Sequence, residues 1–178
     1  MTNKSTLKLV YAAICLALAL VLPFFIGQVP QIGQALSPMH IPVLLCGFLV
    51  GWPYGLIVGF IAPLLRSVMF GMPPMMPGSI SMAFELATYG CVAGILYQIF
   101  PKKNAYIYVT LIIAMLCGRV VWGIVRFLLA KLVLHVEFPF AAWIAGAFTG
   151  AVPGIILHIV LIPVLVMALK KAKLVLND

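Results

Sequence analysis

Acidic side chains are almost absent from this chain of 178 residues. There are three, Glu85, Glu137 and Asp178, and charged residues make up 8% of the sequence against 65% for hydrophobic ones. Soluble globular proteins carry about a quarter charged residues, so this composition excludes a soluble globule. Three carboxylates are also too few for a carboxylate metal cluster. We therefore expect a membrane protein without a metal site.

Recognisable catalytic and nucleotide-binding motifs are missing as well. The sequence contains no H-E-x-x-H, no G-x-S-x-G, no paired Asp and no G-x-x-x-x-G-K-[ST], the patterns of metalloproteases, serine hydrolases and phosphate-binding loops. The four cysteines lie in apolar stretches without C-x-x-C pairs or zinc-like histidine spacing, which is typical of soft packing residues. We expect neither catalysis nor a cofactor, and any ATP hydrolysis that drives transport must take place in another chain.

Long apolar runs dominate what is present. A membrane-spanning backbone must satisfy its own hydrogen bonds, so only helices and closed barrels can cross, and these runs are far too long for barrel strands. About 20 apolar residues cross the hydrocarbon core, so the chain has room for six spans but not for eight. We predict an all-α integral membrane protein, a single domain over residues 1–178, with six membrane helices at about 9–26, 39–50, 56–70, 81–100, 106–134 and 141–169.

Glycine and proline mark the breaks between these runs. The segment Gly51–Gly55 is so short that the second and third spans should form a close hairpin, and the segment 71–78 ends the third span. Pro153 and Pro163 fall inside the sixth span, where we expect kinks. Glycines four residues apart indicate close helix packing, and they recur at Gly51, Gly55 and Gly59, at Gly90 and Gly94, and at Gly146, Gly150 and Gly154.

The net charge of +8 is first of all a topology signal. Cytoplasmic helix ends hold an excess of lysine and arginine, and binding to nucleic acid is a distant second interpretation. A cleaved signal peptide is the main alternative for the first span, but its apolar run continues well past the candidate triplet Ala17-Leu18-Ala19. We predict that both termini are cytoplasmic, because this leaves Lys131 alone on the outer side and places seven lysines inside: Lys4, Lys8, Lys102, Lys103, Lys170, Lys171 and Lys173.

Charged side chains within the spans are few, and charges inside a membrane are by default functional. With this topology, His40, Arg66, Glu85 and Arg126 fall in the outer half of the membrane, with Arg119 near mid-depth. Each of them could instead be an interfacial side chain or part of a structural ion pair. As a set, three arginines and one glutamate leave about two positive charges uncompensated. Because arginine binds carboxylates and phosphates well, this surplus favours a small anionic solute entering from outside.

The fifth span should present a binding face. Arg119 and Arg126 are seven residues apart, which is two helical turns, so they share a face with Trp122 and Gly123 between them. That face offers two guanidinium groups, an aromatic plane and a gap. By contrast, His158 is isolated in the sixth span, on the far side of the charged layer, and we interpret it as a packing histidine with a backbone partner.

At this point the sequence resembles a known family, the substrate-binding S components of energy-coupling factor (ECF) vitamin transporters. The resemblance covers most of the chain and is most specific over residues 38–96. Its elements are the six-span layout with the N-terminus inside, Ala13-x-x-x-Ala17, His40-Ile41-Pro42-Val43, Gly51-Trp52-Pro53-Tyr54-Gly55-Leu56, Gly59, Pro63-Leu64-Leu65-Arg66, Phe70-Gly71-Met72-Pro73 and Ala83-x-Glu85-Leu86-Ala87-x-Tyr89-Gly90.

The resemblance implies a solute-capture protein of the bacterial cytoplasmic membrane. It would work with a transmembrane T component and two ATPase subunits, and its ligand would sit toward the outer side under the loops 27–38 and 71–79. Ala13 and Ala17 would form part of the face that docks onto the T component, although alanines at this spacing can equally pack inside the protein. We also expect the loop 27–38, with Gln31 as a neutral hydrogen-bonding group, to close over the solute.

The substrate does not follow from the resemblance, because binding residues in this family differ with the ligand. The arginine surplus favours a carboxylate vitamin, with pantothenate as the first choice. Riboflavin, cobalamin and folate are the alternatives within the family. Outside it, a membrane scaffold of the rod-shape type, or a small stand-alone transporter or membrane enzyme, could have the same size and number of spans.

Overall fold

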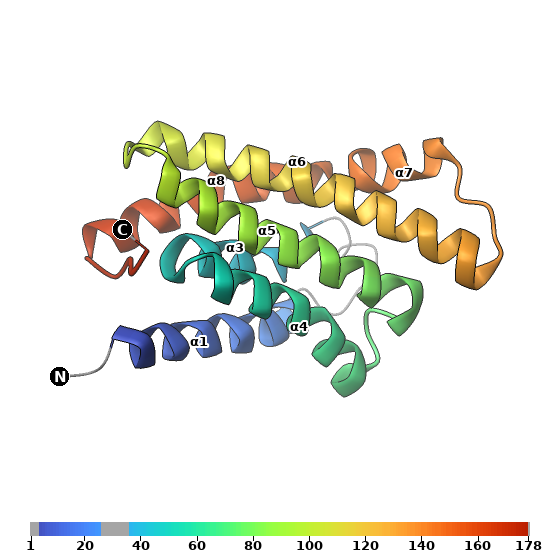
Figure 1. Ribbon diagram of the computed structural model, residues 1–178, viewed down its shortest axis with the longest axis horizontal. Helices are drawn as coiled ribbons and strands as arrows, with labels where there is room; N and C mark the ends of the chain where they lie inside the picture. Colours follow the sequence, from blue (N-terminus) through green and yellow to red (C-terminus); the bar gives the residue numbers. More distant parts are fainter. Residues whose placement is uncertain (1–3, 26–35, 178) are drawn as a thin grey trace.

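The computed structural model is a bundle of helices (Figure 1), and it describes residues 4–25 and 36–177, which contain no strand. The all-α prediction is therefore confirmed. The helices are α1 (Lys4–Phe25), α3 (His40–Val50), α4 (Trp52–Phe70), α5 (Ile80–Ile99), α6 (Asn104–Leu129), α7 (Phe140–Ala147) and α8 (Val152–Lys171). Short helical turns adjoin α5, α6 and α8, namely η1 (Met75–Ser79), η2 (Ala130–Leu134) and η3 (Thr149–Ala151).

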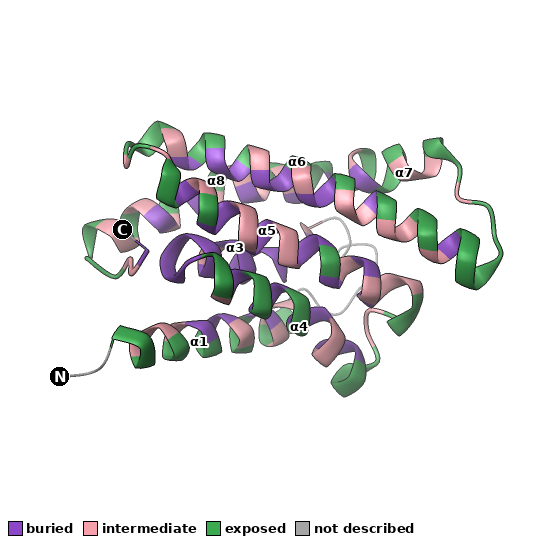
Figure 2. Cartoon of the chain, viewed as in Figure 1, coloured by how far each residue is buried: buried purple, intermediate pink, exposed green. Residues whose placement is uncertain are grey.

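Five helical segments of the described chain, not six, are long and apolar enough to cross a membrane: Lys4–Phe25, Trp52–Phe70, Met75–Ile99, Asn104–Leu134 and Phe140–Lys171. The predicted second span is α3, which has 11 residues and is therefore about 16 Å long, roughly half of the hydrocarbon thickness. Ten of its residues are buried, because α1, α4, α5 and α8 pack around it (Figure 2). A helix enclosed by protein need not match the bilayer.

Two predicted boundaries also need correction. The turn between α3 and α4 is the single residue Gly51, whose φ of 117° suits glycine, so α4 begins at Trp52 instead of 56; the close hairpin is confirmed. The predicted sixth span is not continuous, because the chain leaves helical geometry at Phe148, before η3. Pro153 lies in the first turn of α8, where proline fits without a kink, and Pro163 lies inside α8.

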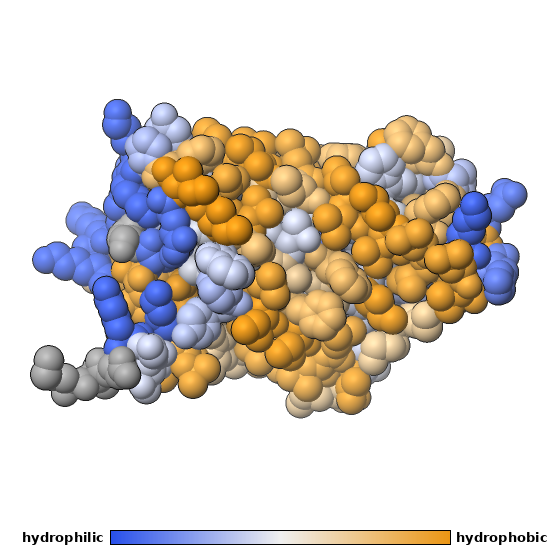
Figure 3. Space-filling model, viewed as in Figure 1, coloured by the Kyte–Doolittle hydropathy of each residue, from blue (hydrophilic) through white to orange (hydrophobic). Residues whose placement is uncertain are grey.

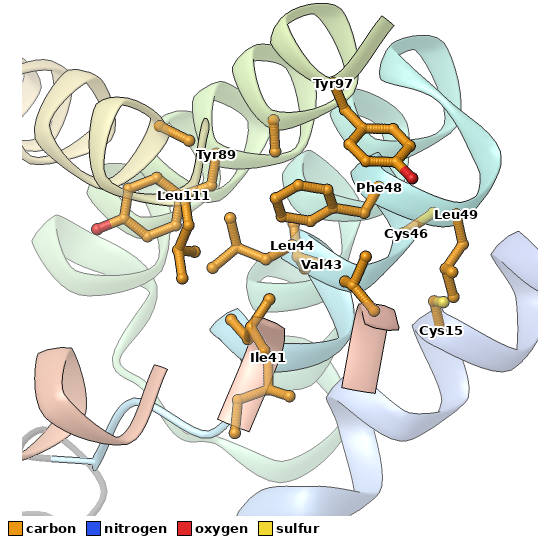
Figure 4. Packing of buried hydrophobic residues seen from close by; sticks show 14 of the residues in the cluster. Cys15, Ile41, Val43, Leu44, Cys46, Phe48, Leu49, Tyr89, Tyr97 and Leu111 are labelled. Atoms are coloured by element: carbon orange, nitrogen blue, oxygen red, sulfur yellow. The ribbon is translucent and has the colours of Figure 1, made fainter. Parts of the chain in front are cut away.

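Close backbone packing holds α3, α4 and α5 together. A methyl group built on Gly55 would meet the backbone of Gly90, one on Gly90 would meet that of Gly55, and one on Gly47 would meet Gly90 as well. These glycines confirm that the small-residue spacing in the third and fourth spans marks internal contacts. Apolar side chains from the same helices and from α6 form the core beside them, including Leu44, Tyr89 and Leu111 (Figure 4).

Both ends of the described chain lie at the same end of the bundle, where hydrophilic residues gather (Figures 1 and 3). Lys170 donates to the backbone carbonyl of Lys102, and the ammonium of Lys102 lies 3.4 Å from the backbone oxygen of Asn177. The buried Asn177 amide donates to the carbonyls of Gly47 and Gly94, so the C-terminal residues are fixed against α3 and α5. The seven lysines predicted to be cytoplasmic belong to the segments that meet here; which side of the membrane this end faces stays a prediction.

Candidate functional site

A cavity of about 530 Å³ lies in the half of the bundle opposite the chain termini. It is bounded by the end of α1, the start of α3, the end of α4, the start of α5, the second half of α6, and α7, with part of the connection from α4 to α5 over it. All the candidate substrate-binding residues that the structure describes line this one cavity: His40, Arg66, Glu85, Arg119, Trp122 and Arg126. Gln31 and most of the predicted lid lie outside the described residues.

Glu85 is the centre of a buried polar cluster at one side of the cavity. Its side chain is on the second turn of α5, and Oε1 lies 3.1 Å from Nη1 of Arg119 on α6. The hydroxyl of Tyr89, one helical turn further along α5, donates to the same oxygen at 3.0 Å. Nε2 of His40 is 3.6 Å away from it. Arg119 and Glu85 therefore compensate each other's charge. Such a structural ion pair is one of the alternatives to a functional role that the sequence leaves open.

The histidine ring at the start of α3 is almost enclosed but poorly satisfied. His40 is 2% exposed. Its Nδ1 has no hydrogen-bond partner among the described residues, and its Nε2 has only the 3.6 Å contact with Glu85. Nε of Arg119 also has no hydrogen-bond partner among these residues. Buried nitrogens without partners are costly. Since both side chains line the cavity, polar atoms of a bound molecule could satisfy them.

The interpretation of His158 was right about its backbone partner and wrong about its place. It hydrogen-bonds to the backbone of Ser37. However, its ring stacks on that of His40 at 5.8 Å between centroids, so His158 supports the polar cluster. Counting positions along a single span could not show this contact, because it joins α8 to the start of α3.

Arg66 lines the cavity from α4 and is held in place by contacts with α1 and with the end of α4. Its guanidinium donates to the backbone carbonyl of Leu20 on α1 and stands over the rings of Phe24 and Phe70, at 4.8 and 5.4 Å from their centroids. The two ring contacts are cation–π interactions, which stabilise a guanidinium without neutralising its charge. Arg66 therefore adds positive potential to the cavity from a fixed position.

Arg126 is the most available of the three guanidinium groups. It is half-buried, stands 5.8 Å from the ring centroid of Trp122, and makes no side-chain hydrogen bond or ion pair with any described residue. The predicted gap at Gly123 does not exist, because the indole of Trp143 on α7 occupies it. That indole donates to the backbone carbonyl of Arg119 at 3.3 Å, and so ties α7 to α6 beside the cavity.

Sequence reasoning missed several residues of the site. Tyr89 could have been found, because it lies four residues after Glu85 on one helix face. Trp143 could not, since its contact joins helices that are distant in sequence. The cavity also has a sulfur-rich apolar lining that no charge pattern indicates, made of Met39, Met72, Met76 and Met82. Thioether side chains adapt their shape to an apolar ligand.

The net electrostatics of the cavity favour an anion. Its described lining holds three arginines and one glutamate, and subtracting the one carboxylate leaves two positive charges in a protein interior. The Glu85–Arg119 pair is nearly dry, at 1% and 8% exposure, so the two remaining guanidinium groups are those of Arg66 and Arg126. A concave, mostly apolar site with a few converging polar groups is typical of a small-molecule site.

The candidate docking residues on α1 lie away from this site. Ala13 and Ala17 are exposed, whereas Ala12 and Cys15 on the other face of α1 are buried in the core. Neither alanine therefore packs inside the described part of the chain. Whether the exposed face meets lipid or a partner helix stays a prediction.

One family model matches this chain. Its description is ECF transporter, substrate-specific component, and the match covers residues 7–166. No curated protein and no solved structure matches the chain. The matched range contains every described residue that lines the cavity.

Proposed function

We propose, from the premise that this chain belongs to the substrate-specific components of ECF transporters, that it captures a small anionic vitamin, with pantothenate as the first candidate. Members of this family are substrate-binding subunits of an importer and not enzymes. The observation that carries the proposal is the cavity with its two uncompensated guanidinium groups. Arginine holds carboxylates with charge-assisted hydrogen bonds, which are stronger than neutral ones.

The size of the cavity bears on the alternative vitamins. Sites for small molecules have volumes of about 300–1,000 Å³, and about 530 Å³ suits a compact vitamin better than cobalamin. Riboflavin is uncharged and would leave the arginine surplus without a counter-charge, whereas folate is anionic and stays a candidate. A scaffold of the rod-shape type has no need for a buried charged cavity, so this cavity favours solute capture.

The partners in this proposal are a transmembrane T component and two ATPase subunits, in a bacterial cytoplasmic membrane. The exposed face of α1 with Ala13 and Ala17 is the proposed docking surface, because alanine lets another helix approach closely in lipid. Substrate would enter from the side opposite the lysine-rich end. Gln31 is proposed to act in the loop that closes behind the substrate.

Mass spectrometry of the detergent-purified protein tests this function. We expect a stoichiometric small anion to be extracted with organic solvent from the native protein and to be lost from an Arg126→Gln variant. A Lys131→Gln variant, which removes the same charge outside this cavity, should retain it. If the native protein neither contains a small molecule nor binds any vitamin added afterwards, the chain does not capture a solute and the scaffold function is favoured.

A further inference from the structure

The two ends of the cavity differ in charge. At the Glu85 end, the carboxylate and the Arg119 guanidinium are 3.1 Å apart and cancel, while His40 and Arg119 still present nitrogens without partners among the described residues. A ligand group at this end can therefore form hydrogen bonds with these nitrogens, but it meets no net charge. An anion placed there would also face the carboxylate of Glu85 and be repelled.

The other end is positive. Arg126 is seven residues beyond Arg119 on α6, which places the two backbone positions about 10 Å apart along one face of the helix. No carboxylate of the described cavity lining offsets Arg126, because Glu85 is the one acidic residue there and it is paired with Arg119. Arg66 is engaged by the Leu20 carbonyl and two aromatic rings. Arg66 keeps its positive charge, but its guanidinium is already held by these contacts, so Arg126 is the guanidinium that can pair directly with an anionic group.

The wall between these ends is apolar. Trp122 lies between the two arginines on α6, and Met82 of α5 and Met76 of η1 line the same cavity. An indole face and thioethers bind hydrocarbon or ring atoms through contact area and not through hydrogen bonds. The middle part of a ligand that reaches both ends would therefore be apolar.

We infer that the substrate is an elongated monoanion with two unlike ends, about 10 Å apart. An uncharged hydrogen-bonding group binds His40 and Arg119, an apolar middle lies against Trp122, and a single carboxylate pairs with Arg126. This inference rests on the proposed function and narrows it to a class of solute. It also assigns different roles to two arginines. Arg126 determines the preference for a charged ligand, whereas Arg119 and its partners bind the uncharged end of the ligand.

Isothermal titration calorimetry with two pairs of probes tests this division. Biotin has all three parts of this class, and pantothenate shares the single carboxylate and the uncharged hydrogen-bonding end but carries an amide in its middle part. Biotin amide and pantothenol are their uncharged counterparts. We expect the native protein to bind at least one of the two acids about tenfold to a hundredfold more tightly than its neutral counterpart, which corresponds to one charge-assisted contact.

Variants then separate the two ends. Arg126→Gln should weaken only the acid and bring the ratio of the two affinities close to one. His40→Phe keeps a ring but removes both nitrogens, so it should weaken acid and neutral probe equally and leave the ratio unchanged. Lys131→Gln is the matched charge control and should change neither. Thermal unfolding of each variant in detergent checks that the protein is folded.

Four results would overturn the inference. They are a native protein that binds acid and neutral probe equally, a native protein that binds none of the four probes, a ratio that survives Arg126→Gln in a folded protein, and a His40→Phe variant that changes only the acid. If mass spectrometry then identifies another vitamin in the native protein, solute capture stands and only the class of substrate is wrong. Absence of any ligand would contradict the proposed function itself.

Discussion

At the scale of single residues, the ion pair between Glu85 and Arg119 should dominate the response to mutation. Removing one partner of a buried pair leaves an uncompensated charge, which typically costs about 3–5 kcal/mol. We expect Glu85→Ala to lower the free energy of unfolding by this amount, measured as a lower thermal midpoint in detergent. Glu137→Ala, which removes an exposed carboxylate, should have little effect.

A second substitution checks that charge is the cause. The double variant Glu85→Ala/Arg119→Met removes both charges and should recover most of the lost stability, because an apolar pair of similar volume is often as stable as a buried ion pair. If the double variant is less stable than Glu85→Ala alone, the loss comes from cavity formation and not from the unpaired guanidinium.

At the scale of helices, the two faces of α1 should respond differently to a large side chain. Ala13→Trp and Ala17→Trp enlarge the exposed face and should hold a partner helix away, so we expect vitamin uptake by cells to fall while the purified protein still binds its ligand. Ala12→Trp, on the buried face one position away, should instead damage folding and binding together. Normal uptake by both exposed-face variants would contradict docking through α1.

At the scale of the whole molecule, the orientation in the membrane can be measured by cysteine labelling. In a variant without the four native cysteines, Lys103→Cys lies at the end that holds both termini and Lys131→Cys lies on η2 near the other end. We expect a membrane-impermeant maleimide to label Lys131→Cys in intact cells and Lys103→Cys only after permeabilisation. The opposite pattern would invert the topology and place the cavity at the cytoplasmic side.

Much of this molecule follows from the sequence, because the bilayer imposes simple rules on a chain. Hydrocarbon requires long apolar helices, and so the approximate bounds of the five long helical segments could be read from apolar runs, whereas the second predicted span is too short to count among them. Helical periodicity placed Arg119, Trp122 and Arg126 on one face of α6. The hydrogen bond from Tyr89 to Glu85 follows the same periodicity, because the two residues are four positions apart, and it could have been predicted in the same way.

The remaining features depend on contacts between residues far apart in the chain, which no local pattern encodes. That α3 is enclosed by protein follows from the four helices packed around it, not from its own composition. His158 joins His40, Trp143 fills the space beside Gly123, and Arg66 reaches Leu20 on α1, because helix packing places these side chains together. Local sequence therefore determined which segments are helical and which residues carry charge, while packing determined which charges are paired and which guanidinium group is left free.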